Sequence, residues 1–213
     1  MKNIKDKMKL YAVSDRSWVG HLTFLQQVEL ALQSGVTFFQ LREKNLDTQA
    51  FIEEAKEIKK LCQKYQVPFI INDRVDIAKI VGADGVHVGQ EDMDLTLARK
   101  ELGPQAIIGV SCHNEEEALL AKENGADYLG VGAMFTTTTK KDTVAVSKET
   151  LREICQTTKL PVVAIGGVQK DNIQTLKDTG IAGVAVVSAI FGAKDISQAC
   201  YELKQEVEKI CHD

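Results

Sequence analysis

The sequence lacks an apolar run long enough to cross a membrane, and residues 1–7 lack the apolar core of a signal peptide. It also lacks paired cysteines. The five cysteines are odd in number, widely spaced and never in a C-x-x-C pattern, so we expect reduced thiols without a metal. There is no excess of basic residues, because the net charge is −4. These absences predict a cytoplasmic protein that binds neither membrane nor nucleic acid.

The composition is that of one folded domain. With 213 residues, 44% hydrophobic and 26% charged, the chain can bury a full core and is neither disordered nor fibrous. Short apolar segments predict buried strands at residues 10–13, 36–39, 69–71, 85–88, 107–111, 128–131, 161–165 and 184–187. Amphipathic patterns between them predict helices, including those at 48–65, 95–102, 151–156 and 173–178 and a closing helix. Thr23 and Asn114 are expected to cap two helices, and Glu117 to complete a capping box with Asn114.

This alternation predicts an α/β protein, a single-domain (β/α)8 TIM barrel over residues 1–213 with a short N-terminal extension at 1–8. Glycines that end helices before strands, at positions 35, 82, 125 and 180, support a repeating parallel architecture. An open doubly wound sheet also alternates in this way. Its dinucleotide-binding version is disfavoured, because no G-x-G-x-x-G follows the first strand.

The most informative stretch is Gln40-Leu41-Arg42-Glu43-Lys44, at the end of an apolar strand. Alternate side chains of a strand share a face, so Gln40, Arg42 and Lys44 would project together. The preceding residues are apolar on both faces, as in a parallel strand that is covered on both sides. Polar residues at the carboxyl end of such a strand indicate a site.

Polar residues or glycines follow most of the other expected strands as well. They are Asn72 and Asp73 after the third strand, Gln90, Glu91 and Asp92 beyond the fourth, Ser111 after the fifth, Thr137, Thr138, Thr139 and Lys140 beyond the sixth, Gly166 and Gly167 after the seventh, and Ser188 after the eighth. Each alone is best read as an ordinary loop residue. Together they favour an active site, because the carboxyl ends of barrel strands and the loops after them build it.

The types of these residues predict phosphate chemistry. Asp73 and Asp92 are hard oxygen ligands, which suit a Mg²⁺ ion shared with phosphate oxygens. Three cations, Arg42, Lys44 and Lys140, would face the same anion. Cations beside carboxylates with a metal between them suit a diphosphate better than a carboxylate substrate.

A second anion site is expected after strands seven and eight. The Gly166–Gly167 turn and Val187-Ser188 match the phosphate cradle that barrels often build there, where bare backbone N–H groups approach the ligand. Two anion sites imply two phosphorylated ligands or one long one.

Two histidine arrangements are set aside. Cys112 and His113 are adjacent, so on a strand they would point to opposite faces and could not pair as a thiol nucleophile with its base. We interpret His87 as a core or near-site histidine, because no second histidine stands at metal-ligand spacing.

In order and spacing, these segments resemble the thiamine phosphate synthases over residues 10–191. The resemblance rests on Gln40-Leu41-Arg42-Glu43-Lys44, Ile71-Asn72-Asp73-Arg74, Gly85 to Asp92, Gly109-Val110-Ser111, Val131 to Lys140, and Ala164-Ile165-Gly166-Gly167. It implies a transferase of thiamine biosynthesis that couples 4-amino-2-methyl-5-hydroxymethylpyrimidine diphosphate to a thiazole or carboxythiazole phosphate, with Mg²⁺, and releases diphosphate. Thr136 departs from the family, which usually has a proline at this place in the loop.

The resemblance also implies a role for each matching residue. Gln40 would contact the pyrimidine, and Asp73 and Asp92 would bind Mg²⁺. The pyrimidine diphosphate would be held by Arg42, Lys44, Asn72, Ser111 and Lys140, of which Arg42, Lys44, Ser111 and Lys140 would be catalytic. The thiazole phosphate would be held by Thr137, Thr139, Gly167, Val187 and Ser188. The expected partners are small molecules. Because dimers are known in the family, a homodimer is one expected assembly.

The implied mechanism needs no strong base. Diphosphate would depart with the help of Mg²⁺ and the cations, and the thiazole nitrogen would attack the resonance-stabilised pyrimidinylmethyl cation. The alternatives are a thiazole tautomerase of the same superfamily and a barrel that senses a phosphorylated ligand without turnover. Asp73, Asp92, Lys44 and Lys140 favour the synthase over the tautomerase. Residues 134–146 are expected to form a lid over the site.

Overall fold

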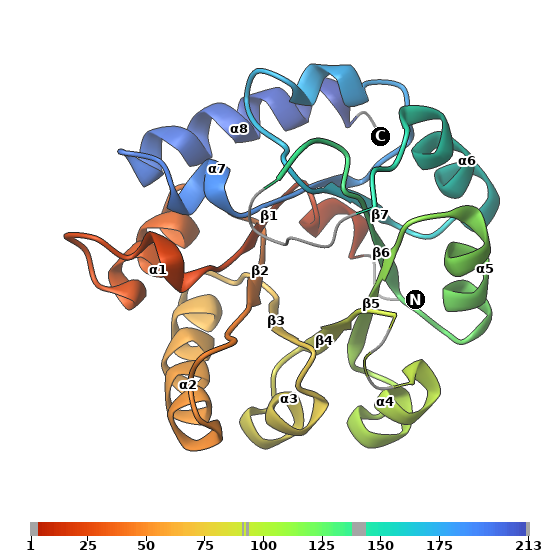
Figure 1. Cartoon of the computed structure of the whole chain (residues 1–213). Helices are drawn as coiled ribbons and strands as arrows, with labels where there is room; N and C mark the ends of the chain where they lie inside the picture. The colour runs from red at the N-terminus through yellow and green to blue at the C-terminus, as the bar shows by residue number, and fades with distance from the viewer. Residues whose placement is uncertain (1–3, 91, 93, 138–143, 212–213) are drawn as a thin grey trace.

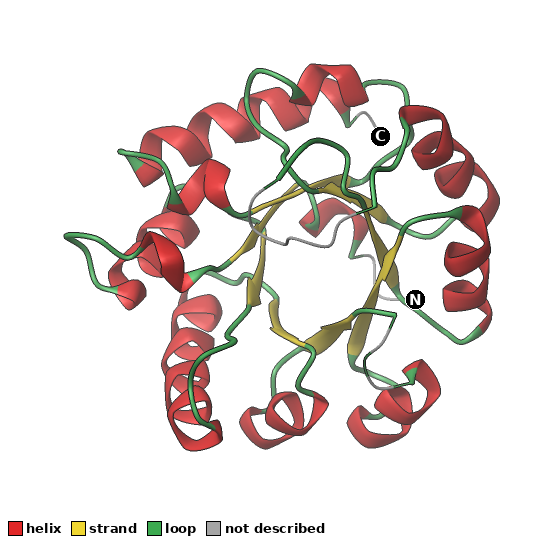
Figure 2. Ribbon diagram, viewed as in Figure 1, coloured by secondary structure: helices red, strands yellow, loops and turns green. Residues whose placement is uncertain are grey.

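Eight parallel strands close into a barrel with helices around it (Figures 1 and 2). The computed structural model describes residues 4–90, 92, 94–137 and 144–211. Each strand pairs with its neighbour in the chain, and β1 pairs with β8 to complete the ring. The strands are β1 (Leu10–Val13), β2 (Phe38–Leu41), β3 (Phe69–Asn72), β4 (Gly85–Val88), β5 (Ile107–Cys112), β6 (Tyr128–Val131), β7 (Val162–Ile165) and β8 (Gly183–Val186). The predicted TIM barrel is confirmed, and the open sheet is excluded.

Helices connect successive strands and cover the outside of the ring, as Figure 1 shows. The α-helices are α1 (Phe24–Gln33), α2 (Thr48–Lys64), α3 (Val75–Val81), α4 (Leu95–Leu102), α5 (Glu115–Glu123), α6 (Lys148–Thr158), α7 (Ser188–Phe191) and α8 (Ile196–Ile210). The 3₁₀ turns are η1 (Lys5–Lys7), η2 (Arg16–Trp18) and η3 (Ile173–Leu176). Within the described residues, none of the helices combines the length and the apolar character needed to cross a bilayer.

Alternation along the strands separates two cores. Phe39 and Leu41 of β2 point outward and belong to the cluster that includes the apolar face of α2, such as Phe51 and Ile58. Phe38, which precedes Phe39, points to the opposite face and belongs to a smaller cluster inside the barrel. Because both faces of the strands are covered, their sequences are apolar throughout and turn polar only towards their carboxyl ends.

The amino end of the barrel is closed by the first described residues. Ile4 and Met8 flank η1 and are buried in the inner cluster, beneath Tyr11 of β1. Residues 4–8 of the expected N-terminal extension are therefore part of the barrel's packing. This leaves the carboxyl ends of the strands as the end at which ligands can enter.

Two local predictions need correction. The sequence predicts a helix about residues 173–178, but the chain forms only η3, after which Lys177 has a ψ of 145° and Asp178 a φ of 65°. The backbone leaves the helical conformation at Lys177, so the segment keeps only a short 3₁₀ turn. The capping box expected at α5 is only half present. Asn114 Oδ1 accepts from the Glu117 amide, but the Glu117 carboxylate accepts from the amide of His113 and not from that of Asn114.

The seven-residue α3 is absent from the predicted helices, since it carries barely two turns of periodicity.

Candidate active site

The predicted site residues on the strands lie towards the carboxyl end of the barrel. Gln40 lies in β2, Asn72 ends β3 and Ser111 lies in β5. Each stands two or four residues after a member of the inner cluster, so its side chain is directed towards the barrel axis. The loops after these strands carry the charged candidates.

Two carboxylates and a lysine meet at this end. Lys44 Nζ donates to Asp73 Oδ2 at 2.5 Å, and Asp92 Oδ2 accepts from the Gly89 amide at 2.6 Å. Partial burial, and then the nearby charge of Asp73, raise the pKa of Asp92 above its ordinary value, although the Gly89 amide opposes them. Asp73 also has a φ of 62°, a conformation that a non-glycine residue keeps only where its surroundings impose it.

This pair of carboxylates fits a hard cation. Two like charges close together favour a positive ion, and Lys44 already takes such a place beside Asp73. No group of three or more His, Cys, Asp or Glu side chains placed to hold a metal occurs among the described residues. Further ligands would therefore come from water and substrate oxygens, which is the usual coordination of Mg²⁺.

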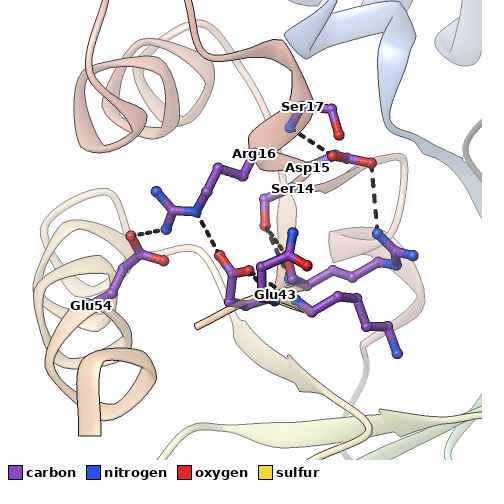
Figure 3. Close-up of polar contacts among 9 residues, drawn as sticks. Ser14, Asp15, Arg16, Ser17, Glu43 and Glu54 are labelled. Atoms are coloured by element: carbon purple, nitrogen blue, oxygen red, sulfur yellow. Dashed lines mark hydrogen bonds and ion pairs between the residues drawn. The ribbon is translucent and has the colours of Figure 1, made fainter. Parts of the chain in front are cut away.

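Arg42 is held by the loop after β1. Its backbone N–H donates to Ser14 Oγ at 3.0 Å, and its Nη1 lies 3.6 Å from Asp15 Oδ2. Asp15 in turn accepts from the Ser17 amide at 2.9 Å, which fixes the carboxylate at the start of η2 (Figure 3). Arg42 is thus positioned by a segment that precedes it by 27 or 28 residues.

The Glu43 side chain points away from the barrel mouth, as alternation predicts, and its carboxylate binds the backbone of the loop that follows β2. Its side chain is only 2% exposed. Its Oε1 accepts the backbone N–H groups of Lys44 at 2.8 Å and Asn45 at 2.9 Å, and its Oε2 accepts from Arg16 Nε at 2.8 Å (Figure 3). Burial alone would raise the pKa of Glu43, but the bonds from the Asn45 amide and from Arg16 outweigh it, and the pKa is lowered. The result is a buried charged anchor under Lys44.

Arg16 joins this anchor to α2. Its Nη2 donates to Glu54 Oε2, so one guanidinium lies between two carboxylates (Figure 3). Ser14, Asp15 and Arg16 are not among the site residues predicted from the sequence, and no role is predicted there for Glu43. The first three carry a readable signal, since they are polar residues that directly follow a buried strand, as at the other strands.

Gln40 and Ser111 are bonded to side chains inside the barrel. Gln40 is 4% exposed, and its Nε2 donates to the Tyr11 hydroxyl at 2.6 Å. Ser111 Oγ lies 3.0 Å from His87 Nε2. His87 is buried and hydrogen-bonded, in keeping with its interpretation as a core or near-site histidine.

The glycine turn after β7 packs tightly against the segment that follows β6. A Cβ on Gly167 would lie 2.4 Å from the carbonyl oxygen of Thr136, and one on Gly166 would lie 2.6 Å from Ala133 Cα. The Phe135 amide also donates to the Gly166 carbonyl at 2.9 Å. Only glycines permit this approach, which joins the two loops that were predicted to hold the second phosphate.

Val187 and Ser188 directly follow β8, at the start of the short α7. Ser188 Oγ accepts from Gln169 Nε2 at 3.4 Å. Asn172 Nδ2 donates to the Gly167 carbonyl at 2.9 Å, which braces the glycine turn from the η3 side. The turns after β7 and β8 are thus connected by side chains of the segment between them.

Part of the expected site lies outside the described residues, namely Thr139 and Lys140, and with them Thr138 and the middle of the expected lid. Thr137 is described and half-buried. The described ends of the expected lid are held by main-chain bonds: the Met134 amide donates to Ile165 O, and the Val146 amide to Ala133 O, each at 2.9 Å.

Cys112 and His113 do not form a pair. Cys112 is fully buried in the outer core, where burial raises the pKa of its thiol to about 12. His113 Nδ1 instead lies 2.9 Å from Glu117 Oε2 on α5. The two side chains thus have different surroundings, as strand alternation predicts.

Comparison with known proteins gives a consistent result. The family described as thiamine monophosphate synthase matches residues 10–190. A thiamine-phosphate synthase of Clostridium tetani is 48% identical over 91% of this chain and 93% of its own length. One from Pyrococcus furiosus is 44% identical over 98% of this chain and 99% of its own. The solved structure of a thiamine phosphate pyrophosphorylase from Pyrococcus furiosus superposes with a TM-score of 0.91 and 41% identity, covering 99% of this chain and 100% of that one.

Proposed function

The chain belongs to the thiamine monophosphate synthase family, and from that premise we propose how its barrel performs the reaction. It is a thiamine-phosphate synthase, a transferase of thiamine biosynthesis that acts on small molecules. The tautomerase and sensor alternatives are not favoured, since the relatives over nearly the whole chain are named as synthases. In our proposal it couples the pyrimidine diphosphate to the thiazole phosphate with Mg²⁺.

The observation that carries these roles is the cluster of Lys44, Asp73 and Asp92 beside Arg42 at the carboxyl end of the strands. Cations that can face a diphosphate stand next to carboxylates that can share a metal with it. Asp73 and Asp92 would hold Mg²⁺. When bound, the ion would offset the charge that grows on the departing diphosphate.

The protein's part in bond breaking is electrostatic. Arg42 and Lys44, with Asn72, Ser111 and Lys140, would hold the diphosphate while the bond from the pyrimidine methylene carbon to oxygen breaks and its electron pair leaves with the diphosphate. The anchors of Arg42 and Lys44 support this role, because a charge held in place needs little reorganisation as the reaction proceeds.

Bond formation requires the thiazole nitrogen to lie close to the new carbocation. The thiazole phosphate would be held by Thr137, Thr139, Gly167, Val187 and Ser188, across the barrel mouth from Lys44. The braced turns after β7 and β8 support this placement. The nitrogen supplies the electron pair of the new bond, so the step needs no base.

We also propose that the reaction takes place in the cytoplasm, where the five free thiols would stay reduced. A homodimer and the absence of nucleic-acid binding stay predictions.

Incubation of purified protein with both substrates and Mg²⁺ tests this function. We expect thiamine phosphate and diphosphate in equal amounts, no product when either substrate is omitted, and loss of turnover in EDTA that Mg²⁺ restores. Absence of product with both substrates and Mg²⁺ would contradict the assignment. Turnover that EDTA leaves intact would contradict the metal alone.

A further inference from the structure

Five side chains from five strands form one continuous chain of hydrogen bonds through the barrel interior. Gln40 Nε2 lies 2.6 Å from the Tyr11 hydroxyl, which lies 2.8 Å from the Tyr128 hydroxyl. The Tyr128 hydroxyl lies 2.9 Å from His87 Nδ1, and His87 Nε2 lies 3.0 Å from Ser111 Oγ. The two ends of the chain are the residues proposed to contact the pyrimidine and its diphosphate.

The packing of the barrel makes room for this chain. Tyr11 is 1% exposed and Tyr128 is fully buried. A Cβ on Gly109 of β5 would lie 2.0 Å from Tyr128 Cζ, and one on Gly130 of β6 would lie 3.1 Å from His87 Cε1. The rings therefore occupy space that two glycines leave open, and their hydroxyl and imidazole groups have little freedom to turn elsewhere.

Proton counting gives the chain a direction. Burial raises the pKa of both phenols above the ordinary value, so Tyr11 and Tyr128 each carry one proton at neutral pH. Because Gln40 Nε2 donates to Tyr11, the proton of Tyr11 is left for Tyr128, and that of Tyr128 for His87 Nδ1. His87 then carries its proton on Nε2 and donates to Ser111 Oγ, so the Ser111 proton is available to a ligand.

The opposite direction requires every group to change at once. Ser111 would donate to His87 Nε2, His87 Nδ1 to Tyr128, Tyr128 to Tyr11, and Tyr11 to the carbonyl oxygen of a flipped Gln40 amide. The two directions differ at both ends. In the second direction the N–H and the C=O of the Gln40 amide exchange places, so a ligand meets them in the opposite order. Ser111 is a donor to the ligand in the first direction and an acceptor in the second.

On the proposed function, both parts of the pyrimidine substrate favour the same direction. A diphosphate oxygen at Ser111 needs a donor, which selects the direction in which Gln40 donates to Tyr11. The edge of a 4-aminopyrimidine places a ring-nitrogen acceptor beside an amino donor, whereas its 4-oxo analogue places a donor beside an acceptor. In one fixed pose, a Gln40 amide of set orientation can therefore match only one of the two.

We propose that Tyr11, Tyr128 and His87 are positioning residues that tie the orientation of the Gln40 amide to the proton of Ser111, and thereby select an aminopyrimidine over its oxo analogue while an anion is held at Ser111. This inference rests on the proposed function for the identity of the ligand. The direction of the chain can be tested without turnover.

The first test is nitrogen NMR of the protein labelled with ¹⁵N-histidine, with Mg²⁺ and inorganic diphosphate as the probe. The His87 signals are assigned by their loss in His87→Asn. We expect a neutral His87 ring with its proton on Nε2. A proton on Nδ1, or a doubly protonated ring, would overturn the proposed direction, and this result does not depend on whether the enzyme turns over.

The second test compares kcat/KM for the aminopyrimidine diphosphate and for its 4-oxo analogue. Tyr128→Phe keeps the ring but interrupts the chain, and Tyr11→Phe interrupts it one step nearer Gln40. We expect the preference for the amino substrate to fall about tenfold in each, since one buried hydrogen bond no longer sets the amide. A merely structural role would lower both rates together and leave their ratio unchanged.

Tyr201→Phe is the matched control, because Tyr201 is 57% exposed on α8, where its hydroxyl accepts from Gln205 Nε2 at 2.7 Å. An unchanged preference in the folded chain variants would overturn the coupling. If Tyr128→Phe does not fold, Tyr11→Phe and the NMR of the unaltered protein still decide the matter. Absence of turnover in the unaltered enzyme with either pyrimidine would instead contradict the proposed function.

Discussion

Replacement of Glu43 with alanine should weaken both the fold and the site, because one buried carboxylate anchors the loop that carries Lys44. The change removes three hydrogen bonds, from the amides of Lys44 and Asn45 and from Arg16 Nε. It leaves Arg16 with Glu54 as its remaining carboxylate partner. Glu43→Gln removes the charge but keeps an oxygen that can accept the two amides.

The size of the effect follows from what surrounds these groups. A hydrogen bond to a charged group is worth about 1.5–3 kcal/mol. Lys44 and Asn45 are exposed, so their freed amides can bond to water, and the Arg16 side chain is 34% exposed and keeps Glu54. We therefore expect Glu43→Ala to lower the free energy of unfolding by about 2 kcal/mol, well below the simple sum. For a chain of this length, that corresponds to a fall of about 4–8 °C in Tm.

Kinetics should report the loss of positioning. With its loop released, Lys44 should hold the diphosphate less well, and kcat/KM should fall between about 10-fold and 100-fold. Urea unfolding and steady-state assays measure the two effects, with Glu53→Ala as the control, since Glu53 is an exposed residue of α2 that contacts Gln49. A Glu43→Ala protein as stable and active as the unaltered one would refute the reasoning. Lower stability with unchanged kinetics would reduce Glu43 to a structural residue.

The remaining predictions concern the pH, the metal, a cysteine and a glycine. Because the pKa of Glu43 is lowered from 4.5, its charge stabilises the fold above pH 4.5, and this stabilisation is lost as the pH falls through the lowered pKa. The difference in unfolding free energy between Glu43→Gln and the unaltered protein should therefore narrow below pH 4.5. A constant difference would argue against a stabilising charge on Glu43. Asp92→Asn should lower turnover by about 100-fold and raise the Mg²⁺ needed for half-maximal rate, whereas Glu123→Gln, an exposed change at the end of α5, should do neither; equal effects would count against the metal site. Cys112→Ser should keep activity within about tenfold. Because the pKa of Cys112 is about 12, its thiol should resist alkylation at pH 8 until the protein unfolds. Rapid labelling of the native protein would contradict the burial of this thiol. Gly109→Ala should destabilise the fold by about 1–3 kcal/mol or more through overlap with a tyrosine ring, whereas Gly20→Ala, with open space around it, should not; equal stability of the two variants would contradict the packing.

The architecture could be predicted because its signal is local. Each strand is a short apolar run covered on both faces, and the repeat glycines at 35, 82, 125 and 180 all have positive φ values where helices give way to strands. Closure of the ring is different, since it depends on the pairing of β1 with β8. Residues 10–13 and 183–186 carry no pattern of their own that distinguishes a closed sheet from an open one.

The charged candidates at the strand ends could also be predicted, because a single rule places them. That rule gave the direction of Glu43 correctly, but it could not give the partner. Arg16 lies 27 residues earlier in the chain, and only the neighbouring positions of β1 and β2 bring it under the loop. The same rule, applied to the end of β1, would have placed Ser14, Asp15 and Arg16 beside the site.

The interior hydrogen-bond chain shows why contacts between distant strands could not be predicted from the sequence. Tyr11 and Tyr128 are 117 residues apart, and each sits in an apolar strand where a large ring is ordinary core. Their hydroxyl groups meet only because the closed barrel sets β1 and β6 across a common interior and because Gly109 leaves the space for a ring. A buried hydroxyl must find a partner, so such tyrosines imply a polar interior before any partner is known. In a barrel whose ligands enter at one end, the buried chain of hydrogen bonds reaches the site through Gln40 and Ser111. Core side chains can then contribute to the selection of the ligand.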